Sequence, residues 1–302
     1  MGLSGIRIVD PVLTEYATGY RNEEFIAGKV FPEVYVKKEG GIIPKFTKEI
    51  FKIYDTFRAP GANSNLYRMD DLNTVEFVLQ EHDLAIPIDR REFSEADYDL
   101  QFQAVEDGLN AIDLKLEKEV ADICQNADNY AASHKKALAT TTCWSESTGD
   151  PIADIAAARE VIRQDTGRYP NTLVLGASTF ATLENNSKIL DRIKYTQLGV
   201  TTEELLSKVF KVDTVIVGKA VYDNGTTQAD VWGDVAILAH VARESRSFRT
   251  PNAGYILRKE GYKQVDKYET EGGKIINIRT TDIRTAKIVG ADAMYLISNT
   301  VK

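Results

Sequence analysis

Cysteine and histidine are scarce, with two cysteines and three histidines in 302 residues. Cys124 and Cys143 are too few for a disulfide framework or a four-cysteine zinc site, and they fit a reducing compartment. His82, His134 and His240 lie far apart along the chain, and none belongs to an HExxH or similar metal-ligand spacing. We therefore expect neither a metal ion nor a cofactor.

Long apolar runs are missing as well. No segment reaches the ~18 apolar residues that a membrane-spanning helix needs. The N-terminal region has no basic stretch followed by an uninterrupted apolar one, so it does not resemble a secretory signal. We expect a chain that is made in a cytoplasm and does not contact a membrane.

The short motifs of well-known enzyme classes are also absent. There is no G-x-S-x-G of a hydrolase, and no G-x-G-x-x-G follows a strand. Gly218 and Lys219 resemble the end of a phosphate-binding loop, but Asp213 stands where the first glycine is needed and Ala220 where serine or threonine is needed. We identify no catalytic residue and predict that the protein is not an enzyme.

Basic residues are fewer than acidic ones, 37 against 45, and the formal net charge is −8. This is the wrong sign for a protein that grips phosphate backbones over its whole surface. Hydrophobic residues make up 43% and charged residues 27%, which is typical of soluble globular domains. The length allows two or three folding units.

The first half of the chain contains three kinds of segment. Residues 1–36 show no sustained period, which indicates an extended arm that needs another surface to lie on. Residues 37–88 have strand-like spacing on both sides of a breaker cluster at residues 59–65, which predicts a long two-stranded excursion. From Ser94, in a sequence that resembles a capping box, apolar residues recur at helical spacing and predict a helix of about 33 residues.

The second half divides into an α/β region and a sheet. Asp150 and Pro151 predict the N-cap and first position of a helix, and Gly167 predicts its end. Further helices and strands are expected up to residue 241, with a turn at residues 223–225. From residue 255 onward alternation dominates, which predicts strands.

Charge is unevenly distributed between two of these segments. Residues 37–58 hold six basic and three acidic side chains, whereas residues 92–128 hold eleven acidic and two basic ones. One interpretation is that each segment is a solvated face. The other is that the basic ribbon of one subunit lies over the acidic helix of the next, an attraction that salt weakens. The interface residues expected from this hypothesis and from the turn are Lys45, Lys48, Lys52, Glu106, Asp113, Glu117, Asp223 and Asn224.

The order of arm, long hairpin, long helix, α/β region and terminal sheet resembles the major capsid proteins of tailed bacteriophages, the Hong Kong 97-type fold. The segments that carry the resemblance are SEADYDLQFQAVEDGLNAIDLKLEKEVADIC for a spine helix, DPIADIAAAREVIRQDTGRYPNTLVLGASTFATL for an axial domain and GYILRKEGYKQVDKYETEGGKIINIRTTDIRTAKIVGADAMYLI for a returning sheet. No single short motif is diagnostic. The resemblance implies an α+β fold with an N-terminal arm, an extended β-hairpin loop, a long spine helix, and peripheral and axial domains.

The same resemblance implies boundaries within the chain. They are an N-terminal arm at 1–36, an extended hairpin loop at 37–90, a peripheral domain with the spine helix at 91–149, an axial domain at 150–241, a peripheral-domain sheet at 242–284 and a C-terminal strand at 285–302 that returns to the axial domain.

The function implied by the resemblance is self-assembly into an icosahedral head around double-stranded DNA, without sequence-specific DNA binding. Expected partners are copies of the chain in hexamers and pentamers, a separate scaffolding protein, a portal and, in some heads, a decoration protein. The expected location is the virion capsid, after assembly in the host bacterial cytoplasm. Two alternatives stay open: an encapsulin-like compartment shell, which shares the fold and differs in cargo, and an enzyme of unknown type that uses the α/β region.

Overall fold

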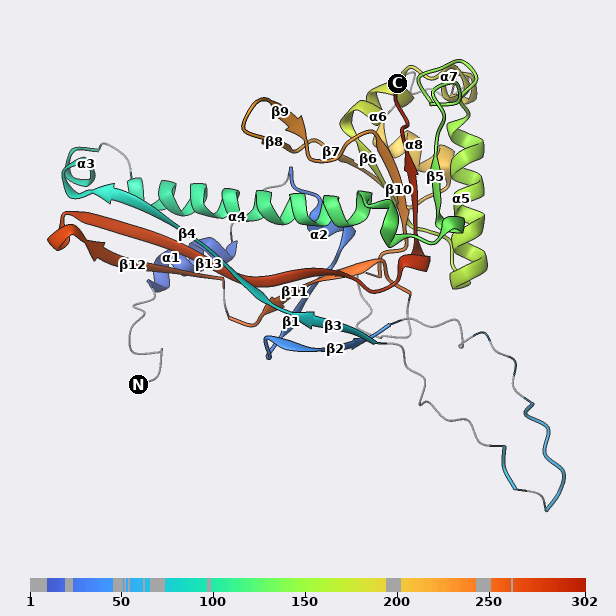
Figure 1. Ribbon diagram of the computed structural model, residues 1–302, viewed down its shortest axis with the longest axis horizontal. Helices are drawn as coiled ribbons and strands as arrows, with labels where there is room; N and C mark the ends of the chain where they lie inside the picture. The colour runs from blue at the N-terminus through green and yellow to red at the C-terminus, as the bar shows by residue number, and fades with distance from the viewer. Residues whose placement is uncertain are drawn as a thin grey trace.

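The computed structural model describes residues 10–19, 24–45, 51, 53, 55–61, 63–65, 74–96, 99–193, 202–242, 251–261 and 263–302. Figure 1 shows a long helix lying over an elongated sheet, with an α/β unit at one end of the helix. Helices and sheets are both present, as the sequence predicts. No helix in these described ranges is long and apolar enough to cross a membrane.

The long helix is α4, Leu100–Gln125, with 26 residues. Asp99 is its N-cap, because the Asp99 side chain accepts a hydrogen bond of 3.0 Å from the Gln101 N–H. The prediction that this helix begins at Ser94 is wrong. Ser94 lies in a separate short helix, α3 (Arg90–Glu95), which ends in extended backbone at Ala96.

The elongated sheet contains five strands. The order is β1 (Glu33–Val36), β11 (Gly254–Lys259), β13 (Ile275–Ile288) and β12 (Gln264–Thr270), and β4 (Gln80–Asp89) pairs with the other edge of β13. One face of this sheet packs against α4, where Val105 and Leu109 meet Val265 and Ile278. The amphipathic pattern of α4 therefore buries its apolar side on β12 and β13.

The α/β unit is built on a second five-stranded sheet. Its order is β5 (Lys135–Ala137), β14 (Met294–Ser298), β10 (Val235–Ala239), β6 (Thr172–Gly176) and β7 (Thr214–Gly218). Every residue of β6 and β10 is buried. This explains why their sequences read as continuous apolar runs rather than as alternation.

Four helices belong to this unit: α5 (Pro151–Thr166), α6 (Ala177–Glu184), α7 (Ser187–Ile193) and α8 (Glu203–Phe210). The predicted signals of α5 are confirmed. Asp150 accepts a hydrogen bond from the Ala153 N–H at 3.0 Å, Pro151 is the first residue of the helix, and Gly167 ends it at φ 68°.

The N-terminal segment does not lack a partner within its own chain, and the prediction of an extended arm is wrong for its described part. It forms α1 (Pro11–Gly19) and α2 (Ala27–Val30). Leu13 of α1 and Phe31 after α2 are buried in two different core clusters. The expectation failed because two short helices are too brief to show a sequence period, yet long enough to place buried residues.

The two-stranded excursion is shorter than predicted. Strand β2 (Gly40–Pro44) pairs with β3 (Thr74–Val78), while β4, in the second half of the expected hairpin, is a full member of the elongated sheet. A second hairpin, β8 (Val221–Asp223) with β9 (Gln228–Asp230), extends from the α/β unit back over α4 (Figure 1). Short 3-10 turns complete the chain at Ala127–Asn129 (η3), Ala132–His134 (η4), Glu271–Gly273 (η5) and Ala291–Ala293 (η6).

Candidate assembly surfaces

Large apolar side chains are exposed on the projecting segment between β2 and β3. Among the described residues of this segment, Ile53 is 96% exposed and Phe57 is 80% exposed. The Asn65 amide nitrogen donates to the carbonyl oxygens of Asp55, at 2.7 Å, and Phe57, at 3.2 Å, which closes a local turn. Figure 1 shows the coloured part of this segment well away from both sheets. A segment that holds apolar side chains in water offers a surface for another molecule.

The basic residues expected on this segment are placed only in part. Lys45 directly follows β2 and is half-buried. Lys48 and Lys52 lie outside the described residues. The proposed contact between the basic ribbon and a neighbouring subunit therefore stays a prediction.

Two of the expected acidic residues on α4 have partners in their own chain. The Tyr16 hydroxyl on α1 donates a hydrogen bond to Glu106. Asp113 lies 3.9 Å from the Lys263 ammonium, and burial raises the pKa of the Asp113 carboxyl. Each residue links α4 to a segment beneath it, so neither is a free charge on an outer face.

Glu117 is a buried anchor, and its expected place at a subunit interface is corrected by the structure. Its side chain is fully buried, and its Oε2 accepts hydrogen bonds from the N–H groups of Ile26 at 3.0 Å and Ala27 at 2.7 Å. The Trp232 indole N–H donates to Oε1 at 2.6 Å. Burial raises the pKa of Glu117 despite these donors. The carboxylate thus caps the first turn of α2 and joins it to α4 and to the α/β unit.

The position of Glu117 in the helical pattern indicates that its side chain is buried. Glu117 lies three positions before Val120 and seven before Cys124, so it falls on the apolar side of the helix rather than on the acidic one. A single carboxylate on an apolar face is buried only where donors satisfy it.

A second buried ionic group joins the elongated sheet to α4. Asp282 on β13 lies 3.1 Å from the guanidinium groups of both Arg258 and Arg284. Arg284 also contacts Glu119 on α4 at 3.2 Å and donates to the Ile112 carbonyl at 2.8 Å. Sequence reasoning missed this group, although charged residues at alternate positions of an apolar strand were its signal.

Asp223 and Asn224 lie at the exposed turn of the β8–β9 hairpin. The Asp223 side chain accepts from the Gly225 N–H at 2.8 Å, and the Asn224 side chain accepts from the Thr226 and Thr227 N–H groups at 3.0 and 2.9 Å. Both side chains therefore stabilise the turn itself. Near its base, Tyr222 lies under the ammonium of Lys118 on α4, 5.0 Å from the ring centre.

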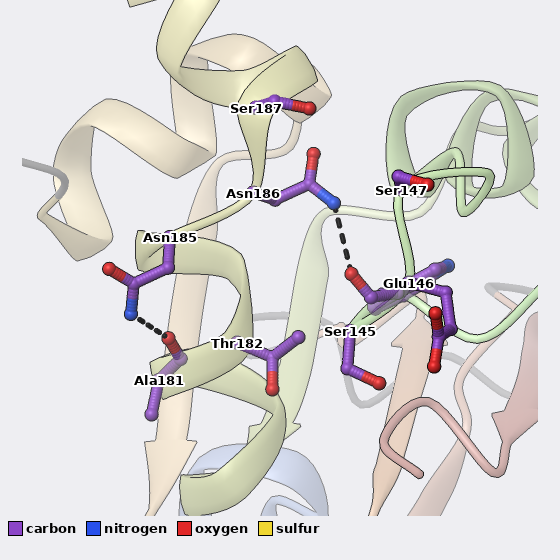
Figure 2. Close-up of a pocket in the computed structure, with 9 residues that line it drawn as sticks. Ser145, Glu146, Ser147, Ala181, Thr182, Asn185, Asn186 and Ser187 are labelled. Carbon is purple, nitrogen blue, oxygen red and sulfur yellow. Dashed lines mark hydrogen bonds between the residues drawn. The ribbon is translucent and has the colours of Figure 1, made fainter.

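A hollow of about 510 Å³ opens between α6, α7 and the loop before α5. Figure 2 shows Asn186 donating to the Trp144 carbonyl, at 3.0 Å, across one side of it. Its lining is mainly hydroxyl and amide groups, and Glu146 is the only carboxylate among the nine lining residues. Glu146 is paired with Lys302 at 2.9 Å. These residues provide a polar surface without a pair of groups for acid–base chemistry.

Comparison with known proteins identifies what this arrangement is similar to. Residues 126–253 match the family model described as phage major capsid protein E. The chain is 44% identical over 301 residues to the major capsid protein of Burkholderia phage BcepMu, covering 98% of both sequences.

Solved structures agree with this match. A phage-related protein from Bordetella bronchiseptica RB50 has a TM-score of 0.83 at 30% identity, over 97% of this chain and 98% of that one. The capsid structure of the cyanophage P-SCSP1u has a TM-score of 0.61 at 11% identity, over 93% and 89% of the two chains, and this shows the shared fold alone. The expected α+β fold of the Hong Kong 97 type is confirmed. On the near full-length identity, the chain belongs to the family of phage major capsid proteins, which assemble with copies of themselves into the capsid of the virion.

Proposed function

We propose that copies of this chain form hexamers and pentamers, and that these close into an icosahedral head around the double-stranded DNA of a tailed phage. The single observation that carries the proposal is the exposure of Ile53 and Phe57 on a segment that projects from the subunit. Full burial of a side chain of this size stabilises a contact by about 1.5–3 kcal/mol. Within a shell, a neighbouring copy supplies that burial.

The expected domain boundaries fit this proposal except at the end of the extended loop. The elongated sheet with α4 corresponds to a peripheral domain, and the α/β unit to an axial domain. Strand β14 lies between β5 and β10 in the α/β sheet, which supports a C-terminal strand that returns to the axial domain. Residues 37–79 would form the extended loop, while 80–89 belong with the peripheral sheet because β4 pairs with β13.

The net charge of −8 supports a container that does not hold its DNA tightly. A separate scaffolding protein, a portal and, in some heads, a decoration protein complete the proposed set of partners. The proposed place of assembly is the host bacterial cytoplasm.

The compartment alternative is less well supported than the phage head. Both use one fold, so the fold does not separate them, whereas 44% identity to a phage major capsid protein over 98% of the chain favours the head. Shells that hold phage DNA when recovered from lysed cells would agree with the proposal. Shells that hold an enzyme cargo would support the compartment.

The direct test is light scattering and negative-stain microscopy of the purified chain, expressed alone and then with an adjacent scaffold gene. We expect closed shells or capsomer rings under at least the second condition. A stable monomer of about 34 kDa under both conditions would contradict the proposal.

A further inference from the structure

Three segments that are far apart in sequence bring one imidazole and two carboxylates together at the end of α5. His134 comes from η4, Asp165 from the last turn of α5 and Asp292 from η6. One ligand atom from each residue lies within 4.8 Å of the other two. The ligands of a single metal ion with metal–ligand distances near 2.1 Å lie about 3–4.5 Å apart, so this spacing needs only a small inward adjustment.

The imidazole is held with one nitrogen facing the carboxylates. The His134 side chain is only 1% exposed. Its Nδ1 lies 3.1 Å from the Ser133 hydroxyl oxygen, which orients the ring. Its Nε2 makes no hydrogen bond with acceptable geometry to any described residue, and Asp165 Oδ2 lies 3.3 Å from it. A buried ring nitrogen without a hydrogen bond needs an explanation, because such groups are normally satisfied.

We propose that His134, Asp165 and Asp292 form a binding site for a divalent transition-metal cation of the Zn²⁺ type. Imidazole nitrogen and carboxylate oxygen are both common ligands of Zn²⁺, and three protein ligands leave one position for water. A contact between Nδ1 and a neighbouring hydroxyl is the outer-shell interaction that fixes the metal-facing nitrogen. The imidazole argues against Mg²⁺ and Ca²⁺, which prefer ligand sets made of oxygen alone.

The charge of the cluster also favours a divalent cation. Two carboxylates lie close together beside a buried ring, and a divalent cation placed among them attracts both. An ion pair between His134 and Asp165 accounts for the 3.3 Å contact, whereas a metal ion accounts for the convergence of all three side chains.

A metal ion here would tie together three parts of the fold. The segment with η4 leads from the spine helix to β5, α5 covers the α/β unit, and η6 leads from β13 to β14. The ion would therefore fix the junction between the elongated sheet and the α/β unit, which lies at one end of α4 (Figure 1). This inference concerns the subunit and does not depend on the proposed assembly.

The test is calorimetric titration of ZnCl₂ into purified full-length protein after removal of metal with a chelator. We expect one Zn²⁺ per chain, and binding at least about tenfold weaker in His134→Asn, Asp165→Asn and Asp292→Asn. The matched control is His82→Asn, which removes a histidine on β4 whose cross-strand neighbour is Asp282 and which is not part of the cluster. Zn²⁺ should also raise the Tm of the wild type and of His82→Asn, and not that of the three cluster variants.

A second measurement keeps the test decisive if a cluster variant folds poorly. Co²⁺ can replace Zn²⁺ in such sites, and the visible absorption of bound Co²⁺ reports its coordination number and geometry, so a lost ligand changes the spectrum. Asp292→Asn is the mildest change, because this side chain is only half-buried. Zn²⁺ that does not bind to the wild type, or that binds equally to His82→Asn and to all three folded variants, would overturn the proposal. The cluster would then be an ion pair between His134 and Asp165.

Discussion

Glu117 joins three parts of the molecule that are far apart in sequence. Its carboxylate accepts from the N–H groups that open α2 and from the indole of Trp232 in the α/β unit, while its backbone belongs to α4. Burying a carboxylate costs free energy of desolvation, so Glu117 can stabilise the fold only because these three donors compensate for that cost. Removing the acceptor leaves all three donors buried and unsatisfied.

Replacing Glu117 with alanine should lower the free energy of unfolding by about 3 kcal/mol or more, because it leaves three donors without an acceptor and opens a cavity. The measurement is urea unfolding followed by circular dichroism. Asp107→Ala is the control, since Asp107 is an exposed carboxylate on the same helix, and it should change stability by less than about 0.5 kcal/mol. Equal effects of the two substitutions would show that Glu117 is not an anchor.

The pH dependence of stability offers a second test of Glu117. Because burial raises its pKa above 4.5, the folded chain holds this proton more tightly than the unfolded chain does. Its contribution is therefore fully present below pH 4.5 and is lost as the pH rises through the folded pKa. Glu117→Gln cannot ionise, so the unfolding free energy of the wild type minus that of Glu117→Gln should fall as the pH rises above 4.5. A difference that rises with pH would contradict the raised pKa.

At the scale of elements, the sequence predicts best where periodicity and caps agree. The start and end of α5 follow from Asp150, Pro151 and Gly167, which need only local geometry. The start of α4 was misplaced because Ser94 resembles a cap, and nothing local separates it from Asp99 five residues later. The residue at which α4 begins depends on which of its side chains pack against β12 and β13, and this tertiary packing is not visible in the local sequence.

The same limit applies to the candidate interface. Eleven acidic residues in one segment indicate a charged helix but do not say which of them turn inward. Glu106, Asp113 and Glu117 contact Tyr16, Lys263 and Trp232, which lie at distant points of the sequence. Likewise, the cluster of His134, Asp165 and Asp292 is assembled only by the fold. The composition of a segment shows that it is charged, but the contact partners of each charged side chain can be identified only from the fold.

The α/β unit depends on close approach between β6 and the loop that precedes β10. A Cβ added at Gly176 would lie 1.9 Å from the Gly233 carbonyl oxygen, a backbone atom that cannot rotate away. Gly176→Ala should therefore destabilise the subunit by about 3 kcal/mol or more, or yield insoluble protein. Gly28→Ala, in α2, has no atom within 4 Å of the added Cβ and should be neutral or stabilising by up to about 1 kcal/mol. Thermal unfolding of both variants checks the prediction, and a Gly176→Ala protein as stable as Gly28→Ala would contradict it.

At the scale of the whole molecule, the described part of the N-terminal segment packs into the core of the subunit, whereas two large apolar side chains of the projecting segment are exposed. Ile26, Val30 and Phe31 are buried in the core cluster that also contains α4 residues. By contrast, Ile53 and Phe57 are almost fully exposed. The contacts of a shell are therefore expected to concentrate on the projecting segment, and the subunit should fold before it assembles.

Because Ile53 and Phe57 are exposed in the subunit, one experiment can distinguish their effect on folding from their effect on assembly. The double variant Ile53→Ser and Phe57→Ser should unfold at the same Tm as the wild type, because neither side chain is buried in the subunit. Its shells should be far fewer, since two lost contacts remove about 3 kcal/mol or more per subunit from assembly. Asn63→Ser, an exposed polar change in the same segment, is the control and should assemble normally. Sedimentation and negative-stain microscopy measure the shell yield. A double variant that assembles as well as Asn63→Ser would mean that these side chains face solvent in the shell, and that the subunits meet through other surfaces.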